Sequence, residues 1–246
     1  AGNPTISITD NNGATAGQVT VSEAGLAAGT LHDGSNSANG TMTVTAPNGL
    51  SSIDFGATNV TLAQLNNLAS TPVTIATADG SVKLTGYNSS TGVISYTYSI
   101  SAPQTAAGPS VTDSLSVTVR DASSQTVSTT LTASITNDAP VATNDTITTT
   151  TGQAVTGSLA GNDTVGADSP GTWAVATNPT HGTVTVGTNG SYNYTPTAGY
   201  VGSDSFTYTL TDKDGDVVTA TANITVSSAG NPTISITDNN GATAGQ

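Results

Sequence analysis

The stretch DSLSVTVRDASSQTVSTTLTASI, residues 113–135, decides the fold of this chain. Polar and apolar residues alternate along both of its halves, and the segment RDASSQT joins the halves. Alternation with a period of two residues is typical of half-buried β-strands, which favour Thr, Val, Ile and Tyr. The stretch therefore predicts a long β-hairpin.

The same hairpin is predicted a second time at residues 204–226, DSFTYTLTDKDGDVVTATANITV. Without gaps, an offset of 91 residues aligns Asp113 with Asp204 and Asp121 with Asp212. Each hairpin is followed by a short linker and then by a proline, which cannot donate to a sheet ladder. We therefore predict two domains that end in the same hairpin, with a boundary at NDAP: domain one at residues 1–137 and domain two at residues 138–227.

Residues 1–18 and 229–246 share the sequence AGNPTISITDNNGATAGQ. Identity at a fixed offset, here 228 residues, is the sign of a tandem array. We expect residues 228–246 to be the linker and first strand of a following repeat. Neighbouring repeats of the same chain are accordingly the expected partners, and the protein is expected to be monomeric.

The rest of the sequence predicts an all-β protein. Alternating runs such as VISYTYSI, residues 93–100, are separated by turn signals at roughly ten-residue spacing, which is typical of immunoglobulin-like β-sandwiches. Only TLAQLNNL, residues 61–68, predicts a helix, with its leucines on one face. The strands expected in domain two carry the chain in at one pole and out at the other. We therefore expect two tandem β-sandwiches arranged end to end.

The chain is strongly acidic, with three Lys and Arg residues, sixteen Asp and Glu residues and a net charge of −13. Nucleic acids and anionic membrane surfaces bind clustered basic residues, so neither is an expected partner. Crowded carboxylates repel one another unless a cation lies among them, and oxygen ligands suit Ca²⁺. The sequence has no cysteine, which excludes disulfides and thiolate metal sites.

The predicted strand order gathers acidic residues where domain two meets domain one. The hairpin tip TDKDGDVV has Asp at alternate positions around a glycine, a spacing that wraps a hard cation in the first half of an EF-hand loop. The Glu at the twelfth position of an EF-hand is missing, so that fold is not predicted, and a plain hairpin turn is the alternative for the tip alone. Further acids come from the loop AGNDTVGADSPG, from the linker and from strand starts. We predict a structural Ca²⁺ site, with several ions, formed by Asp212, Asp214, Asp216, Asp163, Asp168, Asn137, Asp138, Asp145 and Asp113.

The corresponding hairpin tip of domain one, RDASSQT, is poorer in acids. Asp121 is retained, but the other two acids of the tip are replaced by Ser123 and Gln125. Glu23 and Asp33 are the residues expected to compensate in part at this N-terminal pole of domain one. The sequence therefore predicts junctions that alternate between a strongly and a weakly calcium-bound type.

Several motifs resemble one known family. The run NDAPVATNDT, followed by AGNDT and by NPTHGTVTVGTNGSYNYTPTAGYVGSDSFTYTLTDKDGDVVTATANITV, resembles the cadherin-like repeats of giant RTX adhesins that Gram-negative bacteria secrete by the type I pathway. The segments VTVSEAGL, GTMTVTAPNGL and GSVKLTGYNSSTGVISYTYSIS resemble the companion repeat of the same proteins. The resemblance implies an extracellular extender at the bacterial cell surface, stiffened by Ca²⁺ at its linkers, that projects an adhesive tip for attachment and biofilm formation. The ligands it implies are Asp138, Asp163, Asp212, Asp214 and Asp216, with Asp204 at the next junction.

Two other functions are weighed against this one. An enzyme is not predicted, because His32 and His181 lie in different domains and two carboxylates at a hairpin tip lack the cleft that glycoside hydrolysis needs. No small-molecule substrate is therefore expected. The alternative is a directly adhesive glycan- or ice-binding module, with Trp173 as a sugar platform or strand threonines as a flat array. Trp173 is more typical of a core aromatic on a strand at residues 172–177, and Thr is a common strand residue.

Overall fold

The computed structural model describes residues 2–11, 18–105 and 108–230, and almost all of its regular structure is β-strand. Both predicted hairpins are present: β9 (Ser110–Asp121) pairs with β10 (Thr126–Thr136), and β16 (Gly202–Thr211) pairs with β17 (Val217–Ser227). Buried and exposed residues alternate along β9 and β16, as the sequence pattern requires. The all-β prediction is confirmed. Residues 231–246, on which most of the predicted further strand falls, lie outside the described residues.

Domain one is a sandwich of two five-stranded sheets around one apolar core. Phe55 and Tyr96 are among its fully buried side chains, one from each sheet. The first sheet has the order β1 (Thr5–Ile8), β3 (Ser37–Thr45), β8 (Val93–Ser99), β7 (Ser81–Asn88) and β6 (Val73–Ala76). The second has the order β2 (Val19–Ser22), β10, β9, β4 (Leu50–Phe55) and β5 (Thr58–Thr61).

The helix predicted at residues 61–68 is present but shorter. Helix α1 spans Leu62–Leu65 and begins at a capping box, in which Thr61 and Gln64 satisfy each other's backbone N–H groups. Leu65 and Leu68 are fully buried, so the apolar face of the segment packs as the sequence indicates. A helical turn of 3-10 type, η1 (Glu23–Gly25), follows β2. In the described part of the chain, no helix has the length and apolar character needed to cross a membrane.

Domain two is a smaller sandwich with its own core, which includes Trp173, Tyr194 and Tyr208. Its four-stranded sheet has the order β11 (Asp145–Thr150), β17, β16 and β13 (Thr172–Thr177). Its three-stranded sheet has the order β12 (Val155–Ser158), β15 (Ser191–Pro196) and β14 (Gly182–Val186).

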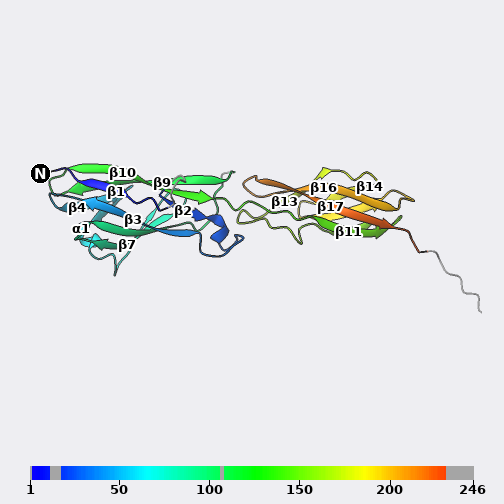
Figure 1. Ribbon diagram of the computed structural model, residues 1–246, viewed down its shortest axis with the longest axis horizontal. Coiled ribbons are helices and arrows are strands. Elements are labelled where there is room, and N and C mark those ends of the chain that lie inside the picture. Colours follow the sequence, from blue (N-terminus) through cyan, green and yellow to red (C-terminus); the bar gives the residue numbers. More distant parts are fainter. Residues whose placement is uncertain (1, 12–17, 106–107, 231–246) are drawn as a thin grey trace, which may run out of the picture.

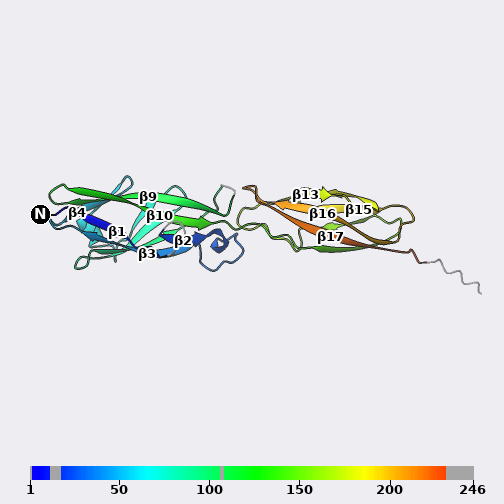
Figure 2. The same ribbon diagram turned by 45° about the horizontal axis from the view of Figure 1, so that its top comes forward.

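Each sandwich carries the chain from one pole to the other. β2 runs parallel to β10, the last strand of domain one, and β11 runs parallel to β17, the last strand of domain two. Because an early strand and the last strand point the same way, the chain enters at one end of each sandwich, its N-terminal pole, and leaves at the opposite end, its C-terminal pole. The two sandwiches consequently follow each other along one long axis (Figures 1 and 2).

Candidate metal centre at the junction of the sandwiches

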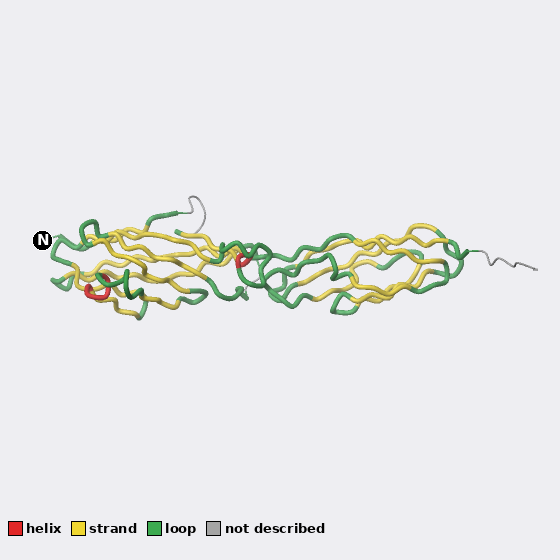
Figure 3. The backbone as a smooth tube through the Cα atoms, turned by 90° about the horizontal axis from the view of Figure 1, so that it is seen from below, coloured by secondary structure: helices red, strands yellow, loops and turns green. Residues whose placement is uncertain are grey.

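Four segments that are distant in sequence meet at the junction between the two sandwiches. Domain one contributes η1 at its C-terminal pole, which Figure 3 shows as the helical turn beside domain two. The linker contributes Asn137, and domain two contributes the loop between β12 and β13 together with the tip of the β16–β17 hairpin. Each segment follows a strand end, so the strand directions alone bring the four together.

Three aspartates form the centre of this site. One oxygen from each of Asp168, Asp212 and Asp214 lies within 4.8 Å of the others. Asp168 is 2% exposed and Asp212 is 5% exposed, so both carboxylates are removed from water. Among the described residues, no lysine or arginine forms an ion pair with these carboxylates. Like charges at this separation in a buried position repel strongly, and a positive charge between them would relieve the repulsion.

Several buried oxygens of the site have no hydrogen-bond partner. They are Asp168 Oδ2, Asp212 Oδ2, Asp214 Oδ1 and Asn137 Oδ1. The opposite sides of two of these groups are satisfied: Asp212 Oδ1 accepts from the N–H groups of Gly215 and Asp216 at 3.0 and 2.8 Å, and Asn137 Nδ2 donates to Asp214 and Asp216. Buried polar atoms in native proteins nearly always have a partner, so these four acceptors form a group that a cation could satisfy.

The pKa values of three carboxyl groups at the site are raised, chiefly by burial. Burial, followed by the nearby charges of Glu23 and Asp214, raises the pKa of Asp168 to about 7. Burial and the close approach of the Asp214 carboxylate raise the pKa of Asp212 to about 6. Burial also raises the pKa of Glu23. In each case the protein disfavours the charged form, which is the situation that a bound cation reverses.

Asp138 joins the two domains directly. Its carboxylate accepts from the Thr30 N–H at 2.9 Å, from the Thr30 hydroxyl at 2.6 Å and from the Ala167 N–H at 3.0 Å. Thr30 belongs to domain one, and Ala167, from the β12–β13 loop, packs in the apolar cluster of domain one. Asp138 was predicted as a ligand, and the structure shows that protein donors already occupy both of its oxygens.

The predicted position of Glu23 is wrong. It was expected at the N-terminal pole of domain one, but it lies at the junction, where its carboxylate accepts from the backbone N–H groups of Gln104 and Asp138 and contacts Asp168. The reason is the direction of β2, which runs parallel to β10 and so ends where domain one ends. A cavity of about 180 Å³, lined in part by Gln104, Asp168, Lys213 and Asp214, opens beside the site.

The structure does not bring Asp145 and Asp163 into this centre. They form a separate pair around the Tyr208 hydroxyl, which lies 2.9 Å from Asp145 Oδ2 and 3.1 Å from Asp163 Oδ1. Asp163 also accepts from the Trp173 ring N–H at 2.8 Å and from the Thr143 N–H at 2.9 Å. These donors belong to domain two, so the pair holds the strands of that domain together.

Asp113 and Asp204 also lie outside the centre, contrary to the expectation for Asp113. Tyr98 donates to Asp113 and Tyr194 donates to Asp204, both at 2.7 Å, and each pair joins the two sheets of its sandwich. Each aspartate accepts in addition from the N–H of the next residue, at 2.8 and 2.9 Å. The equivalence predicted from the offset of 91 residues is therefore a structural one, in which the aspartates act as matching cross-links.

Asp33 and Asp121 complete the set of predicted residues. Asp33 is exposed and accepts from the Ser35 N–H at 2.9 Å, within its own turn. Asp121 lies at the N-terminal pole of domain one, in the β9–β10 hairpin tip. Asp33 was expected at the N-terminal pole of domain one with Glu23, and this position is also wrong: its loop lies at the C-terminal pole, because the Ser22 N–H at the end of β2 donates to Ser35 O. Neither Asp33 nor Asp121 forms a hydrogen bond with the junction acids among the described residues. The centre therefore consists of Asp168, Asp212, Asp214, Asp216, Asn137 and Glu23, with Asp138 beside it.

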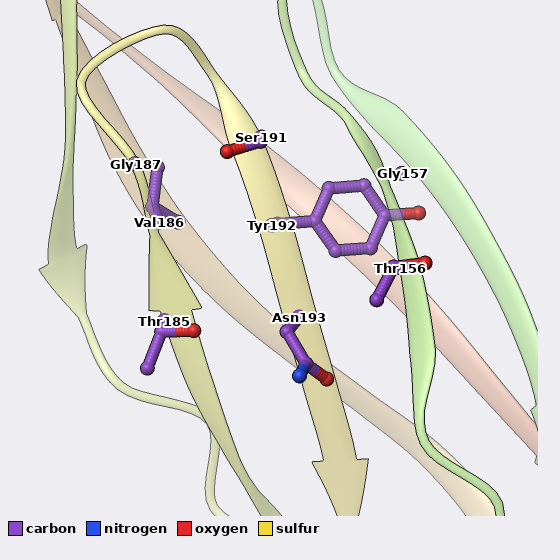
Figure 4. Close-up of a pocket in the computed structure, with 8 residues that line it drawn as sticks. All are labelled: Thr156, Gly157, Thr185, Val186, Gly187, Ser191, Tyr192 and Asn193. Carbon is purple, nitrogen blue, oxygen red and sulfur yellow. The ribbon is translucent and has the colours of Figure 1, made fainter.

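The aromatic residue considered for glycan binding is not available on the surface. Trp173 is 8% exposed and packs in the core of domain two, as the sequence indicates for a strand tryptophan. A hollow of about 610 Å³ lies on the outside of the β12–β15–β14 sheet of domain two (Figure 4). Its polar residues, which include Thr156, Thr185 and Asn193, carry no charge, and the hollow is separate from the metal centre.

Comparison with known proteins agrees with the fold of domain two. Residues 137–225, about a third of the chain, match the family described as Bacterial Ig domain. This match and the two packed sheets both indicate an immunoglobulin-like sandwich for that part of the chain. No curated protein matches the chain.

Solved structures that match the chain weakly include cadherin domains and a glycoside hydrolase. Extracellular cadherin domains 1–4 of protocadherin gamma B7 are 13% identical over 86% of this chain and 49% of theirs, with a TM-score of 0.31. The human desmocollin-1 ectodomain is 13% identical over 72% of this chain and 33% of its own, with a TM-score of 0.30. An endo-fucoidan hydrolase from glycoside hydrolase family 107 is 22% identical with a TM-score of 0.29, and the match covers 65% of this chain and only 24% of the hydrolase. Similarity at this level contributes nothing to the assignment of function.

Proposed function

We propose that this chain is a structural spacer of a cell-surface protein, and that Ca²⁺ bound at the junction between its two sandwiches stiffens it. The observation that carries the proposal is the group of four buried, unpaired oxygens where the domains meet. A spacer needs poles at opposite ends and a junction that resists bending, and a cation held by both domains would supply the second property.

The donor set fits calcium. All of the available ligand atoms are carboxylate or amide oxygens, which hard cations prefer, and the groups come from a helical turn, the linker, a loop and a hairpin tip. Asp168, Asp212, Asp214 and Asp216 would supply carboxylates, Asn137 would supply its amide oxygen, and Glu23 would supply a carboxylate from domain one. Ca²⁺ accepts six to eight oxygens in irregular arrangements, whereas Mg²⁺ requires a near-octahedral set, so Ca²⁺ is the better match.

The arrangement explains how the charge state of one site would control the shape of the chain. Glu23 belongs to domain one, Asp168 to a loop of domain two and Asp212 to a hairpin tip, so these residues tie separate segments to one point. A bound Ca²⁺ supplies the positive charge that lets these carboxylates stay close together. Without it, their mutual repulsion favours separation of the segments, and Asp138 remains as the main polar bridge between the domains.

The resemblance to repeats of RTX adhesins supports a more specific proposal for the protein that contains this spacer. We infer an extender region of an adhesin that Gram-negative bacteria export by type I secretion, located outside the cell and holding an adhesive tip away from it. Neighbouring repeats of the same chain are its proposed partners. The proposed role is non-catalytic, because the acidic centre consists of structural contacts between domains and its cavity is small.

Calcium titration and small-angle scattering test the proposal together. Isothermal titration of the chain with CaCl₂ should release or absorb heat, and the double variant Asp212→Asn, Asp214→Asn should lose this signal. Asp54→Asn is the matched control, since Asp54 lies on β4 of domain one, away from the junction, and its carboxylate accepts a hydrogen bond from Asn59. Scattering in CaCl₂ should indicate a straight rod that becomes shorter on average, through bending, in EGTA. Unchanged heat in the double variant, or unchanged maximum dimension in EGTA, would contradict the proposal.

A further inference from the structure

The N-terminal pole of domain one contains a counterpart of the junction site with most of its acids replaced. Asp121 occupies the position of Asp212 in the equivalent hairpin tip, and its Oδ1 accepts from the N–H groups of Ser123 and Gln125 at 2.9 and 2.8 Å. The backbone closes in the same way in both tips, with an N–H to C=O bond from Asp121 to Gln125 at 3.0 Å and a corresponding bond at 3.1 Å in domain two. The two aspartates therefore have the same local setting on one side.

The second carboxylate oxygen distinguishes the two poles. Asp212 Oδ2 is buried without a partner, whereas Asp121 Oδ2 accepts from Asn48 Nδ2 at 2.7 Å. The same amide nitrogen lies 3.3 Å from the carbonyl oxygen of Gly2, in the segment that leads into domain one. Gly2 stands two residues before Pro4, as Asp138 stands two residues before Pro140. The Asn48 amide thus joins the hairpin tip to the incoming segment.

The turn that carries Asn48 is fixed by its own hydrogen bonds. The Gly49 N–H donates to Ala46 O at 2.8 Å, and Gly49 has a φ of +84°, which glycine adopts without strain. The Ala122 N–H donates to Gly49 O at 2.8 Å, so the turn is attached to the hairpin tip beside Asp121. The amide is therefore held in position before it makes its two contacts.

We propose that Asn48 is the residue that makes the N-terminal pole of domain one independent of metal, because its amide takes the place that a cation would occupy between the Asp121 carboxylate and the incoming backbone. Two N–H groups of one neutral side chain perform the bridging, and they cannot be removed by a chelator. The contrast with the other pole rests on the proposed calcium function, but the bridging role of Asn48 does not. Domain one then has a C-terminal pole that responds to calcium and an N-terminal pole that does not.

Three variants test this inference in the full chain. Asn48→Ala removes the bridge, and Asn48→Asp replaces it with a carboxylate that would require a cation. Asn67→Ala is the matched control at an exposed site, where the amide donates to the neighbouring Thr71 hydroxyl within one turn. Hydrogen–deuterium exchange, followed by peptide, measures the incoming segment, the turn and the hairpin tip. In EGTA, Asn48→Ala should speed exchange there by roughly five- to thirty-fold, the factor for a lost net bond of one to two kcal/mol, and CaCl₂ should not restore it. The Asn67→Ala variant should leave these peptides unchanged.

The aspartate variant supplies the converse result. Asn48→Asp should show fast exchange at this pole in EGTA and slower exchange in CaCl₂, because the introduced carboxylate and that of Asp121 would then form a pair that a cation can bridge. The inference is overturned if Asn48→Ala leaves exchange at the pole unchanged in EGTA, or if the wild-type pole gains protection from CaCl₂. If calcium does not act at the junction, only the peptides of that junction will fail to respond, and the result for Asn48→Ala in EGTA will still stand.

Discussion

Replacing Asp168 by asparagine should stabilise domain two when no cation is present. The carboxylates of Asp168, Asp212 and Asp214 have oxygens within 4.8 Å of one another. At that separation, and at an effective dielectric constant of ~20, two like charges repel by about 3.5 kcal/mol. The substitution removes two such pairs, of which the raised pKa values have already relieved a part by protonation at neutral pH. We therefore expect a net gain of about 1–3 kcal/mol in the free energy of unfolding in EGTA.

The single tryptophan of the chain makes this change measurable. Trp173 lies in the core of domain two, so its fluorescence follows the unfolding of that domain. A domain of this size shifts its Tm by about 4–8 °C for each kcal/mol, so Asp168→Asn should melt at least roughly 4 °C higher than the wild type in EGTA. In CaCl₂ the difference in Tm between the variant and the wild type should become smaller or change sign. The reason is that the wild type gains binding free energy, about 2.7 kcal/mol at a Ca²⁺ concentration of a hundred times the Kd, which the variant loses.

Asp163→Asn is the matched control for this experiment. Asp163 lies in the same β12–β13 loop, but its carboxylate accepts hydrogen bonds from Trp173, Thr143 and Tyr208. Losing the charge there should cost about 1–3 kcal/mol with or without calcium. A lower Tm for Asp168→Asn in EGTA, or the same response from both variants, would refute the reasoning that the junction carboxylates lack a positive partner.

Three further outcomes are expected. Gly92→Ala should destabilise domain one by about 3 kcal/mol in urea unfolding, since φ is +71° and an added Cβ would lie 1.9 Å from a backbone oxygen; a loss below about 1 kcal/mol would contradict this. Tyr98→Phe and Tyr194→Phe should each lower the free energy of unfolding by about 1–3 kcal/mol, with or without calcium, because each removes one hydrogen-bond donor from a buried aspartate. Chemical denaturation measures both losses, and unequal losses would argue against the equivalence of the two pairs. The hydrogen bond from Asn48 lowers the pKa of Asp121, so NMR titration should find this pKa higher in Asn48→Ala. The stability that this lowered pKa provides is present above the ordinary Asp pKa of ~3.9 and is lost as the pH falls through the lower native value. The wild type and Asn48→Ala should therefore have similar free energies of unfolding near pH ~2. A difference that stays constant with pH would exclude a contribution of the Asp121 pKa to stability.

The strands were predictable because their signal is local. Alternation of polar and apolar residues gave β13 at 172–177 and the β9–β10 and β16–β17 hairpins, and the structure has them at those places. The helix predicted at 61–68 is shorter in the structure: it ends at Leu65 with Asn66 as its C-cap, and Leu68 is buried in the turn that follows. Local patterns of this kind do not depend on how distant segments pair.

The site was predictable only in part, because it depends on strand direction and on donors. The hairpin tip and Asp168 converge as expected, but Glu23 lies at the other pole from the one predicted, since the parallel pairing of β2 with β10 has no signature in the sequence. Asp163 has the same appearance in the sequence as Asp168, yet Trp173 and Tyr208 satisfy it. The sequence PNG, residues 47–49, predicts only a turn. It contains no pattern that would predict the hydrogen bonds from the Asn48 amide to Asp121 and Gly2.

The parallel pairing of the outer strands also decides how the rod bears a load. When the two ends of the chain are pulled apart, tension enters each sandwich at one pole and leaves at the other, so in domain two it draws β11 and β17 past each other along their length. Six residue pairs of that ladder, from Asp145 opposite Ala222 to Thr150 opposite Ser227, are then stressed together and not one at a time. In domain one the force first reaches β1, which four residue pairs hold to β3, and then β2, which four residue pairs hold to β10, so each ladder is shorter than that of β11 and β17. Single-molecule stretching should therefore find domain one yielding first, and the opposite order would show that other contacts set the mechanical strength.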